Sequence, residues 1–491
     1  MKLRDIVSKI NPETVAGNLD LEIESICYDS RKAEKNSLFV AIPGFKADGH
    51  RFIQEAYTRG ARAFVVEKGL NPLPGAALIK VPSSRKALAR ISNIFYNYPS
   101  KKLKLVGVTG TNGKTTVTYF LQSIFRQAGI KTGRLSTINY DLGGEIYPAT
   151  TTTPESLELQ KFLEKMLINQ VKYVFMEVSS HSLVLHRVEE TEFSWAIFTN
   201  LSPEHLDFHK NMEDYLEAKS ILFKKMAPDK KALINIDDPA GYKIIKETSC
   251  SVITYGIKKQ ADYQASDLSM DGRRVLFKAK INGKNEEFEI HLPGFHNVYN
   301  ALAAIGVARE EGIHPDVIKK GLKDVRRVPG RLELIENKAN LNIYVDYAHT
   351  PSSLEQVLLS LRKLTPGRLI VVFGCGGDRD PYKRPVMGKI AFKIADYVVI
   401  TSDNPRSEDP QSIIADIEKG IVIEGAKKDK DYTTFVDRKE AIGFALSKLR
   451  YKDALLVAGK GHEKVQIFKD KVVPFDDRTV IRELLRESDL L

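Results

Sequence analysis

The chain has 491 residues, which is too long for one ordinary hydrophobic core and indicates about three domains. Hydrophobic residues make up 43% and charged residues 28%, as in soluble globular proteins, and no apolar stretch follows the opening Met1-Lys2-Leu3-Arg4. We therefore expect neither export nor membrane insertion.

The charge and the cysteines exclude further classes. The net charge of +11 would suit a polyanionic partner, but Lys and Arg alternate with Asp and Glu along the whole chain, which favours a solvated surface over a nucleic-acid site. Cys27, Cys250 and Cys375 are too far apart for a disulfide framework or a zinc spacing. We expect a protein of the reducing cytoplasm.

The first hundred residues contain no nucleotide signal. They have turn clusters at Pro43-Gly44 and around residues 71–75, and they end at Tyr98-Pro99-Ser100-Lys101-Lys102. This pattern predicts a separate small α/β domain.

A nucleotide-phosphate loop follows over residues 105–116. A β-branched strand runs into Gly110-Thr111-Asn112-Gly113-Lys114-Thr115-Thr116, where glycines let backbone N–H groups approach phosphate oxygens. Lys114 can reach the terminal phosphates and Thr115 can bind Mg²⁺. Apolar residues at helical spacing from Val117 to Phe125, with Gly129 after them, predict a helix that begins at the loop. Gly110 stands only three residues before Gly113, so the loop is shorter than the usual P-loop.

Polar segments then follow apolar strands repeatedly, in an alternation of strands and helices that predicts mostly parallel sheets. Because ligands of open α/β sheets bind beyond the carboxyl ends of the strands, two such sheets predict a site between two domains. The segments are Glu177-Val178-Ser179-Ser180-His181, the residues from Thr199 to His205, Asp346-Tyr347-Ala348-His349, the residues from Gly374 to Asp380, Ser402-Asp403-Asn404-Pro405-Arg406 and Gly459-Lys460-Gly461-His462-Glu463.

The chemistry of these side chains leaves alternatives open. Glu177, His205 and Thr115 could hold Mg²⁺, or the acid and the imidazole could be structural hydrogen-bonding groups. Lys219 lies in a predicted helix, where composition alone favours a surface lysine.

Three loops of the last third could bind a charged ligand. The segment Asp378-Arg379-Asp380 could take an anion or be a solvated turn. The loops Asn404-Pro405-Arg406 and Gly461-His462-Glu463 could bring an arginine and a glutamate to one ligand, or be two polar loops.

The motifs, in this order, resemble those of the Mur ligases, and most closely those members that add the third residue of the peptidoglycan stem peptide. The resemblance covers nearly the whole chain. It rests on Asp29-Ser30-Arg31, the loop from Gly110 to Thr116, Glu177-Val178-Ser179-Ser180-His181, His205-Leu206-Asp207-Phe208-His209, His296-Asn297-Val298-Tyr299-Asn300-Ala301, Pro329-Gly330-Arg331, Asp346-Tyr347-Ala348-His349-Thr350-Pro351, Gly376-Gly377-Asp378-Arg379-Asp380 and Asp403-Asn404-Pro405-Arg406.

The resemblance implies an α/β protein of three domains. Residues 1–100 would hold the UDP end of the substrate, residues 101–330 would form a P-loop ATPase domain with a mostly parallel sheet, and residues 331–491 would form a Rossmann-like domain that holds the amino acid. It also implies catalytic roles for Lys114, Glu177 and His205, and a carbamylated Lys219 that serves as an anionic ligand of Mg²⁺ together with Thr115, Glu177 and His205.

The resemblance further implies the substrate contacts. Those to ATP are the residues Gly110, Thr111, Asn112, Gly113, Lys114, Thr115, Thr116, Asn300, Arg331 and Asp346. Those to UDP-MurNAc-L-Ala-D-Glu are Ser30, Phe45, Lys46, Ala47, Thr152, Thr153, Ser179 and Arg187. Thr151 and Leu185 stand where some members have asparagine and glutamine, and they are not included.

The segment from Asp403 to Arg406 resembles the signature of members that add meso-diaminopimelate. That amino acid has a distal carboxylate, which lysine lacks, and Arg406 can bind it with two parallel hydrogen bonds. The matching contacts are Arg379, Asp403, Asn404, Pro405, Arg406, Gly459 and Glu463, of which Glu463 suits the distal ammonium.

The implied reaction is amide formation through an acyl phosphate, with ATP as co-substrate, by a protein expected to be a monomer. Two alternatives remain. The same scaffold could add L-lysine, or the chain could be a regulatory ATP-binding protein without catalysis. Arg406 favours diaminopimelate over lysine, and the intact set of Lys114, Glu177, His205 and Lys219 favours an enzyme.

Overall fold

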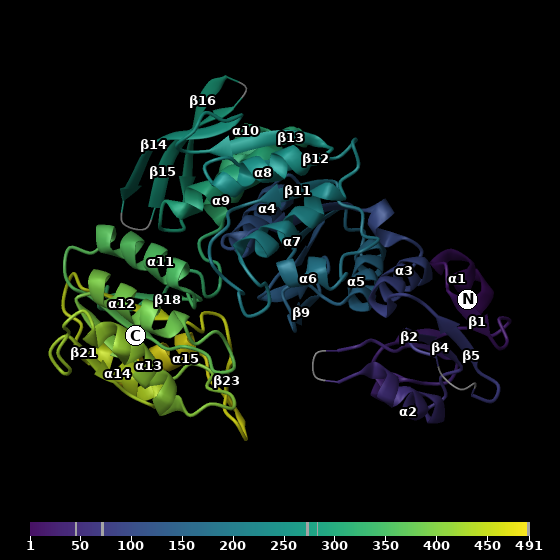
Figure 1. Cartoon of the computed structure of the whole chain (residues 1–491). Helices are drawn as coiled ribbons and strands as arrows, with labels where there is room; N and C mark the ends of the chain where they lie inside the picture. Colours follow the sequence, from purple (N-terminus) through teal and green to yellow (C-terminus); the bar gives the residue numbers. More distant parts are fainter. Residues whose placement is uncertain (45–46, 70–72, 272–273, 282, 489–491) are drawn as a thin grey trace.

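Three α/β parts follow one another along the chain, each built on its own sheet, and the central one lies between the other two (Figure 1). The computed structural model describes residues 1–44, 47–69, 73–271, 274–281 and 283–488. The predicted α/β class is confirmed.

The first part has a five-stranded sheet of order β1-β5-β4-β3-β2, parallel except at β1. Alternate strand residues point to opposite faces, so that Leu38 and Val40 pack with α1 and α3 while Phe39 packs with α2. The elements are α1 (Leu3–Ile10), β1 (Thr14–Ala16), β2 (Ser25–Cys27), η1 (Ser30–Lys32), β3 (Ser37–Val40), η2 (Gly49–Phe52), α2 (Ile53–Thr58), β4 (Ala63–Val66), β5 (Ala77–Lys80), α3 (Ser84–Phe95) and η3 (Pro99–Lys102).

The central part has an 11-stranded sheet of order β16-β15-β14-β13-β12-β11-β6-β10-β7-β8-β9. The pairings from β14 to β7 are parallel, as predicted, and helices cover both faces. The elements are β6 (Lys104–Thr109), α4 (Lys114–Gln127), β7 (Thr132–Leu135), β8 (Asn139–Asp141), β9 (Ile146–Pro148), α5 (Ser156–Ile168), β10 (Tyr173–Glu177), α6 (Ser180–Val184), β11 (Trp195–Phe198), α7 (Met212–Lys224), β12 (Lys231–Asn235), α8 (Pro239–Glu247), β13 (Ser251–Gly256), β14 (Tyr263–Asp271), β15 (Arg274–Ile281), β16 (Lys284–Ile290), α9 (His296–Glu310) and α10 (Pro315–Asp324).

Both ends of this sheet depart from the predicted alternation of strands and helices. At one end, β7, β8 and β9 follow one another without a helix and pair antiparallel. At the other end, strands β14, β15 and β16 follow one another without a helix and pair antiparallel, forming the arm at the top of Figure 1. In β15, buried residues such as Val275, Phe277 and Ala279 alternate with more exposed ones, because one face packs on the core and the other faces solvent.

The last part has a six-stranded sheet of order β17-β18-β22-β19-β20-β21, parallel except at β17, and a separate β23–β24 hairpin. Helices α11 to α13 cover one face, and α14 and α15 cover the other. The elements are β17 (Glu333–Leu334), β18 (Asn342–Asp346), α11 (Pro351–Leu364), β19 (Leu369–Phe373), α12 (Lys383–Ile394), β20 (Tyr397–Ile400), α13 (Pro410–Val422), β21 (Tyr432–Thr434), α14 (Arg438–Ser447), β22 (Ala454–Ala458), β23 (Val465–Ile467), β24 (Val472–Pro474) and α15 (Asp477–Glu487).

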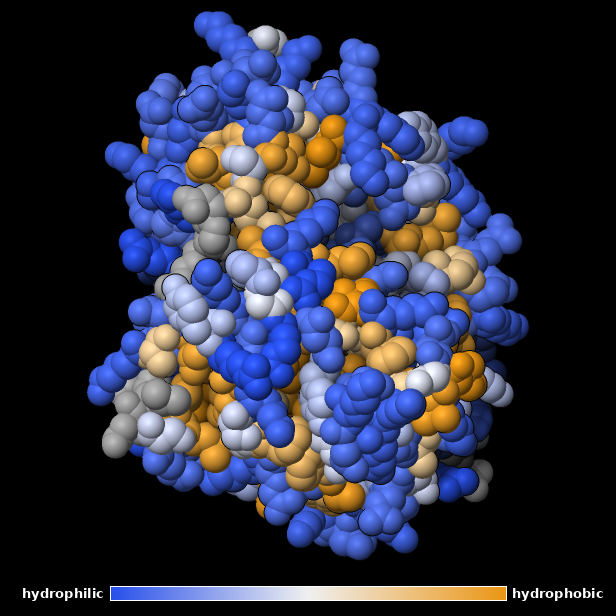
Figure 2. Space-filling view, turned by 90° about the vertical axis from the view of Figure 1, so that its left-hand side faces the viewer, coloured by the Kyte–Doolittle hydropathy of each residue, from blue (hydrophilic) through white to orange (hydrophobic). Residues whose placement is uncertain are grey.

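The visible surface is dominated by hydrophilic side chains, with hydrophobic groups in smaller patches between them (Figure 2). Within the described residues, no helix combines the length and the apolar character needed to cross a membrane.

Candidate active site

The phosphate loop joins the end of β6 to the start of α4, as the sequence predicts. Two glycines have left-handed backbone angles, with φ of 141° at Gly110 and 90° at Gly113. A Cβ atom would lie 1.9 Å from Thr199 Oγ1 at Gly110 and 2.3 Å from Asn300 Oδ1 at Gly113, so neither position accepts another residue without displacement. Helix α4 begins at Lys114, which lines a cavity together with the loop, so the positive end of the helix dipole faces that cavity.

Lys114 is the first residue of α4 and its ammonium is held by the loop itself. Nζ donates to the carbonyl oxygens of Gly110 at 2.9 Å and Thr111 at 2.7 Å. Burial lowers the pKa of Lys114, while Glu204 and Glu177 oppose that shift. Within the described part of the chain, Lys114 forms no ion pair, so a polyphosphate in the cavity would supply its missing counter-charge.

Thr115 and Glu177 form an oxygen-rich corner of the same cavity. The Thr115 hydroxyl donates to Glu177 Oε1 at 2.8 Å, and Glu177, at the end of β10, is only 1% exposed. The backbone N–H of Thr137 also donates to Oε1 at 2.9 Å. A hydroxyl and a carboxylate beside a phosphate loop are the donor types that Mg²⁺ takes, so these residues fit that ion.

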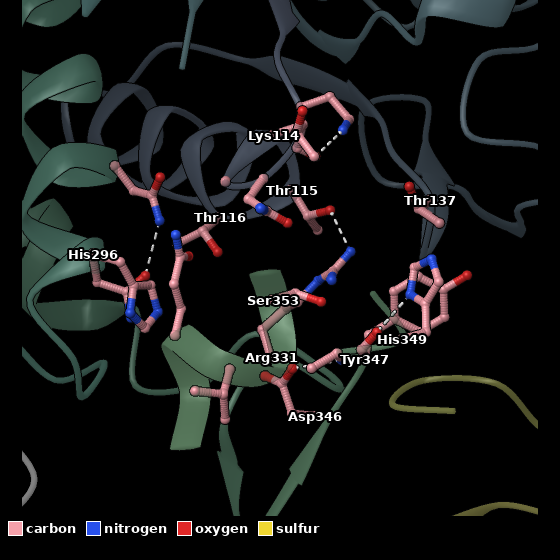
Figure 3. A pocket seen from close by; sticks show the side chains of 18 of the residues that line it. Lys114, Thr115, Thr116, Thr137, His296, Arg331, Asp346, Tyr347, His349 and Ser353 are labelled. Atoms are coloured by element: carbon pink, nitrogen blue, oxygen red, sulfur yellow. Dashed lines mark hydrogen bonds between the residues drawn. The ribbon is translucent and has the colours of Figure 1, made fainter. Parts of the chain in front are cut away.

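Residues of the last part, among them Arg331 and Asp346, line this cavity from the opposite side (Figure 3). Arg331 Nη2 donates to Thr115 Oγ1 at 3.2 Å, and its guanidinium lies 4.8 Å from the Tyr347 ring centre. Asp346, at the end of β18, accepts from the N–H groups of Leu332 at 2.6 Å and Ala348 at 2.7 Å. Burial raises the pKa of Asp346. The cavity thus lies between the central and the last part of the chain, where the sequence predicts a site.

Asn300 lies on α9, on the wall of the cavity beside the loop. Its side chain donates from Nδ2 to Asn297 Oδ1 at 2.9 Å, which turns Oδ1 of Asn300 toward Gly113. The predicted nucleotide residues Asn300, Arg331 and Asp346 are thus brought together with the loop from Thr111 to Thr116.

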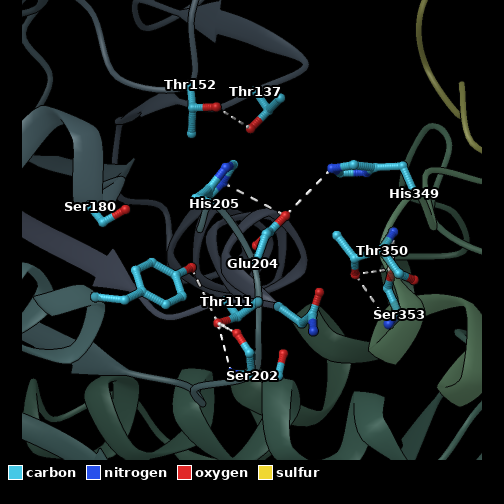
Figure 4. Close-up of polar contacts among 12 residues, drawn as sticks. Thr111, Thr137, Thr152, Ser180, Ser202, Glu204, His205, His349, Thr350 and Ser353 are labelled. Carbon is cyan, nitrogen blue, oxygen red and sulfur yellow. Dashed lines mark hydrogen bonds and ion pairs between the residues drawn. The ribbon is translucent and has the colours of Figure 1, made fainter. Parts of the chain in front are cut away.

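His205 also lines the cavity, with Glu204 between it and a histidine from the last part (Figure 4). Glu204 Oε1 lies 3.7 Å from His205 Nε2 and 3.4 Å from His349 Nε2. Burial lowers the pKa of His205 to about 4, so its imidazole is neutral and able to bind a metal near neutral pH. Sequence reasoning singled out neither Glu204 nor His349 as a site residue, although both stand in the polar segments that follow strands.

Lys219 lies on α7, as predicted for a helix, but it is not a surface lysine. Its side chain is 1% exposed, and Nζ donates to the Gly110 carbonyl oxygen at 2.9 Å and lies 4.2 Å from the Tyr215 ring centre. Burial and the neighbouring Lys114 bring the pKa of Lys219 well below its ordinary value. Among the described residues, no three His, Cys, Asp or Glu side chains gather as a metal cluster, so a metal here would depend on hydroxyl or modified-lysine oxygens as well.

Four residues predicted to contact the UDP substrate lie together beside Glu177. Thr153 Oγ1 donates to the Glu177 carbonyl oxygen at 2.8 Å and accepts from the Ser179 N–H at 3.1 Å. Arg187 Nη1 donates to the Thr153 carbonyl oxygen at 3.1 Å, and Thr152 lines the cavity.

The other four predicted contacts belong to the first part of the chain. Ser30 donates to Glu55 Oε2 at 2.8 Å, and Ala47 is exposed. Phe45 and Lys46 lie outside the described residues. Tyr28, two residues before Ser30, donates to Glu158 Oε1 on α5 at 3.0 Å, which ties the first part to the helix that follows Thr153.

A groove adjoins the cavity at the phosphate loop, which we call the phosphate cavity. The two share Thr137, Thr152 and Tyr347. One side is formed by residues near β8 and β9, and the other by Asn404, Arg406 and Glu463 of the last part. Two of the predicted amino-acid loops, Asn404-Pro405-Arg406 and Gly461-His462-Glu463, therefore reach the same groove, whereas Arg379 is not among the residues that line it. This groove extends the phosphate cavity toward the carboxyl ends of the C-terminal strands.

Arg406 is one of the basic side chains that line this groove. Nη1 donates to the Gly377 carbonyl oxygen at 2.6 Å, and burial together with the nearby Arg379 lowers the pKa of Arg406. Among the described residues, neither Arg379 nor Arg406 forms an ion pair, although Asp403, Glu463 and Asp378 act on Arg406 from further away. Two adjacent guanidinium groups with no carboxylate in direct contact among the described residues are suited to an anionic ligand.

Asp403 and Gly459 meet behind Arg406. Gly459 has a φ of 107°, and a Cβ there would lie 2.5 Å from Asp403 Oδ2, so the glycine allows the close approach. Pro405 contributes its backbone, which lies against Gly377. The predicted residues 403–406, Gly459 and Glu463 are thus brought into one cluster.

Three family models match successive parts of the chain. They are described as the Mur ligase family, catalytic domain, at residues 22–96, the Mur ligase middle domain at residues 108–308, and the Mur ligase, glutamate ligase domain, at residues 330–461.

Relatives match over full length. A UDP-N-acetylmuramoyl-L-alanyl-D-glutamate–2,6-diaminopimelate ligase of Caldanaerobacter subterraneus subsp. tengcongensis is 46% identical over 489 residues. The match covers 100% of this chain and 100% of the relative. The protein of the same name from Clostridium tetani is 46% identical over 492 residues, with 99% of this chain and 100% of the relative covered.

Solved structures share the fold. A structure of a UDP-N-acetylmuramoyl-L-alanyl-D-glutamate–2,6-diaminopimelate ligase has a TM-score of 0.68 and 30% identity, covering 100% of this chain and 99% of the other. The MurF ligase of Thermotoga maritima in complex with ADP has a TM-score of 0.64 at 20% identity, covering 95% and 97%, and shows likeness of fold alone.

Proposed function

Because this chain belongs to the Mur ligase family, we propose that it is an ATP-dependent amide ligase that adds meso-2,6-diaminopimelate to UDP-MurNAc-L-Ala-D-Glu. The proposal is carried by the adjoining cavities, one built on the phosphate loop and one lined by Arg406 and Glu463, which meet at Thr137, Thr152 and Tyr347. This arrangement would bring a nucleotide phosphate and an amino acid to opposite sides of one acceptor carboxylate.

In the proposed reaction, an oxygen of the D-Glu side-chain carboxylate takes the γ-phosphoryl group of ATP, and ADP leaves. The amine of diaminopimelate then attacks the carbonyl carbon of the acyl phosphate, the bond to the phosphate oxygen breaks, and the amine loses a proton as the amide forms. No protein nucleophile is needed, so the side chains act by positioning and by stabilising charge.

The roles of the phosphate-site residues follow from their chemistry. Lys114, the loop N–H groups and Arg331 would neutralise the negative charge on the transferred phosphoryl group. Thr115, Glu177, His205 and carbamylated Lys219 would hold Mg²⁺, which polarises phosphate oxygens when it is bound. The carbamate assignment is supported by the burial of Lys219 without a carboxylate ion pair among the described residues.

The amino-acid residues would select the distal end of diaminopimelate. Arg406, with Arg379 beside it, would supply positive charge for the distal carboxylate, and Glu463 would supply negative charge for the distal ammonium. Gly459, Asp403, Asn404 and Pro405 would shape the pocket around them. L-Lysine lacks the distal carboxylate and would leave the arginine pair without a partner.

We also propose the domain limits 1–100, 101–330 and 331–491, a monomeric state and a cytoplasmic location. The limits fall between the three sheets, whose strands lie within residues 14–80, 104–290 and 333–458. The first of these parts, with Ser30 and Ala47, would hold the UDP end of the substrate.

The test is phosphate release by the purified protein with Mg-ATP and UDP-MurNAc-L-Ala-D-Glu, in parallel with meso-diaminopimelate, L-lysine or no amino acid, followed by product masses. Phosphate release and a tripeptide mass with diaminopimelate alone are expected. A tripeptide mass with lysine at equal efficiency would refute the assigned amino acid. Folded protein that binds ATP and releases no phosphate in any arm would refute the ligase and favour a regulatory ATP-binding protein.

A further inference from the structure

A lysine outside the groove organises two of the residues that face it. Lys460 follows β22 and Gly459, and its side chain is 0% exposed. Its ammonium makes three contacts, with Asn404 Oδ1 at 3.0 Å, Glu463 Oε2 at 3.2 Å and the Val465 carbonyl oxygen at 2.7 Å. An ammonium has three N–H donors, so these contacts use all of them.

The contacts of Lys460 determine which way the Asn404 amide is turned. Asn404 Oδ1 accepts both from Lys460 Nζ and from the Ile467 N–H, each at 3.0 Å. Because two donors meet this atom, it must be the amide oxygen, and the NH₂ group must point the other way. There Nδ2 donates to Glu463 Oε2 at 2.7 Å.

Glu463 is therefore held through one oxygen. Oε2 receives donors from both Asn404 and Lys460, whereas no described residue donates to Oε1 of this side chain, which lines the groove and is 29% exposed. A carboxylate fixed in this way presents one acceptor in one direction. A ligand ammonium would meet that acceptor without having to order the Glu463 side chain first.

We propose that Lys460 is a positioning residue for amino-acid selection: by fixing Asn404 and one oxygen of Glu463, it aims the other oxygen at the distal ammonium of the incoming amino acid. This inference rests on the proposed function. Lys460 itself does not line the groove, so it acts through Glu463 rather than on the substrate.

The test compares two amino acids that differ only at the distal ammonium, meso-diaminopimelate and 2-aminopimelate, which keeps both carboxylates but has hydrogen in place of that group. The variant is Lys460→Met, which keeps an unbranched side chain and removes the three donors. Lys469→Met, at an exposed position in the turn of the β23–β24 hairpin, is the matched control.

In the wild-type protein, kcat/KM should favour diaminopimelate, because 2-aminopimelate offers no ammonium to Oε1 of Glu463. Lys460→Met should reduce this preference by about tenfold or more, mainly through the KM for diaminopimelate, while the KM for ATP stays within about twofold. Glu463→Gln should reduce the same preference, and the double variant should add little to either single change. Lys469→Met should behave as wild type.

The outcomes separate this inference from the proposed function. A wild-type protein that forms no amide refutes the function. A wild-type protein that discriminates, with a Lys460→Met variant that discriminates equally well, refutes only the role of Lys460, as does an equal loss with both amino acids. If Lys460→Met does not fold, as judged by its thermal unfolding, Lys460→Leu carries the same comparison, since it also removes all three donors.

Discussion

Arg406 offers the sharpest test of how the groove selects its amino acid. Its Nη1 is already bonded to the Gly377 carbonyl oxygen, which leaves Nη2 and Nε for a ligand carboxylate. Arg406→Met removes this fork and the charge, while the left-handed backbone at φ 54° stays equally demanding for both residues. The change also removes the bond to Gly377, a loss that is shared by every amino acid tested, so the comparison of two amino acids isolates the ligand-binding end of the side chain.

The expected loss follows from the bonds removed. A hydrogen bond to a charged group contributes about 1.5–3 kcal/mol, and Arg379 preserves part of the positive potential, so the net loss should be about 3 kcal/mol. At about 1.4 kcal/mol per factor of ten, kcat/KM for diaminopimelate should fall by roughly 100-fold. For Arg406→Lys, kcat/KM for diaminopimelate should lie between the values of wild type and Arg406→Met, because lysine keeps the charge without the planar fork.

The assay is initial-rate ligation with diaminopimelate and with L-lysine at saturating ATP and nucleotide substrate. Lysine has no distal carboxylate, so its kcat/KM should change by less than about threefold, which corresponds to well under 1 kcal/mol. Arg450→Met, at an exposed position of the same domain, serves as control. If the ratio of the two kcat/KM values is the same in Arg406→Met and wild type, the carboxylate clamp does not exist.

The other predictions concern the phosphate site and the stability of the last domain. Lys114→Met should abolish phosphate release while leaving thermal unfolding near wild type, because Nζ bonds only to loop carbonyls in the described structure; near-normal turnover would contradict its role. Lys219→Ala should lose activity and regain part of it when short carboxylates such as acetate are added, whereas lack of rescue would count against the carbamate. Arg438→Met should reduce the free energy of unfolding of the last domain by about 3–5 kcal/mol in urea titration, because it leaves Asp477 buried without its partner, both side chains being 0% exposed. Arg438→Met combined with Asp477→Leu should reduce the free energy of unfolding by less than Arg438→Met alone. An equal or larger reduction would show that the loss of stability does not come from breaking the Arg438–Asp477 ion pair.

The sequence predicted the strand ends well because each combines two strong local signals. An apolar β-branched run and a polar or glycine-rich segment after it predicted β6, β10, β19 and β22, and therefore which loops would share an edge of the sheet. The helix after the phosphate loop ends at Gln127, and Gly129 has a φ of 73°, as predicted for the residue that closes a helix.

The contacts between distant segments were not predictable from the same signals. Glu204 and His349 are 145 positions apart, and nothing in either segment indicates that their side chains meet. The burial of Lys219 likewise depends on where α7 packs beneath the loop, whereas composition favours exposure for any lysine. Lys460 was visible as part of Gly459-Lys460-Gly461, but its role depends on the amide orientation of Asn404, which only the packed structure fixes.

Direct contacts between the last domain and the phosphate loop link the position of that domain to the geometry of the phosphate cavity. Arg331 reaches Thr115, His349 reaches Glu204, and Ser352 lies 3.0 Å from Ser202 between the hydroxyl oxygens. All three contacts join the last domain to residues on or beside the phosphate loop. Any rotation of that domain therefore changes the groups around the nucleotide phosphates and, through Arg406 and Glu463, displaces the amino-acid groove by the same movement. Phosphoryl transfer and amine attack are thereby tied to one domain position, which would allow the acyl phosphate to form only where the amine is held ready and water is excluded.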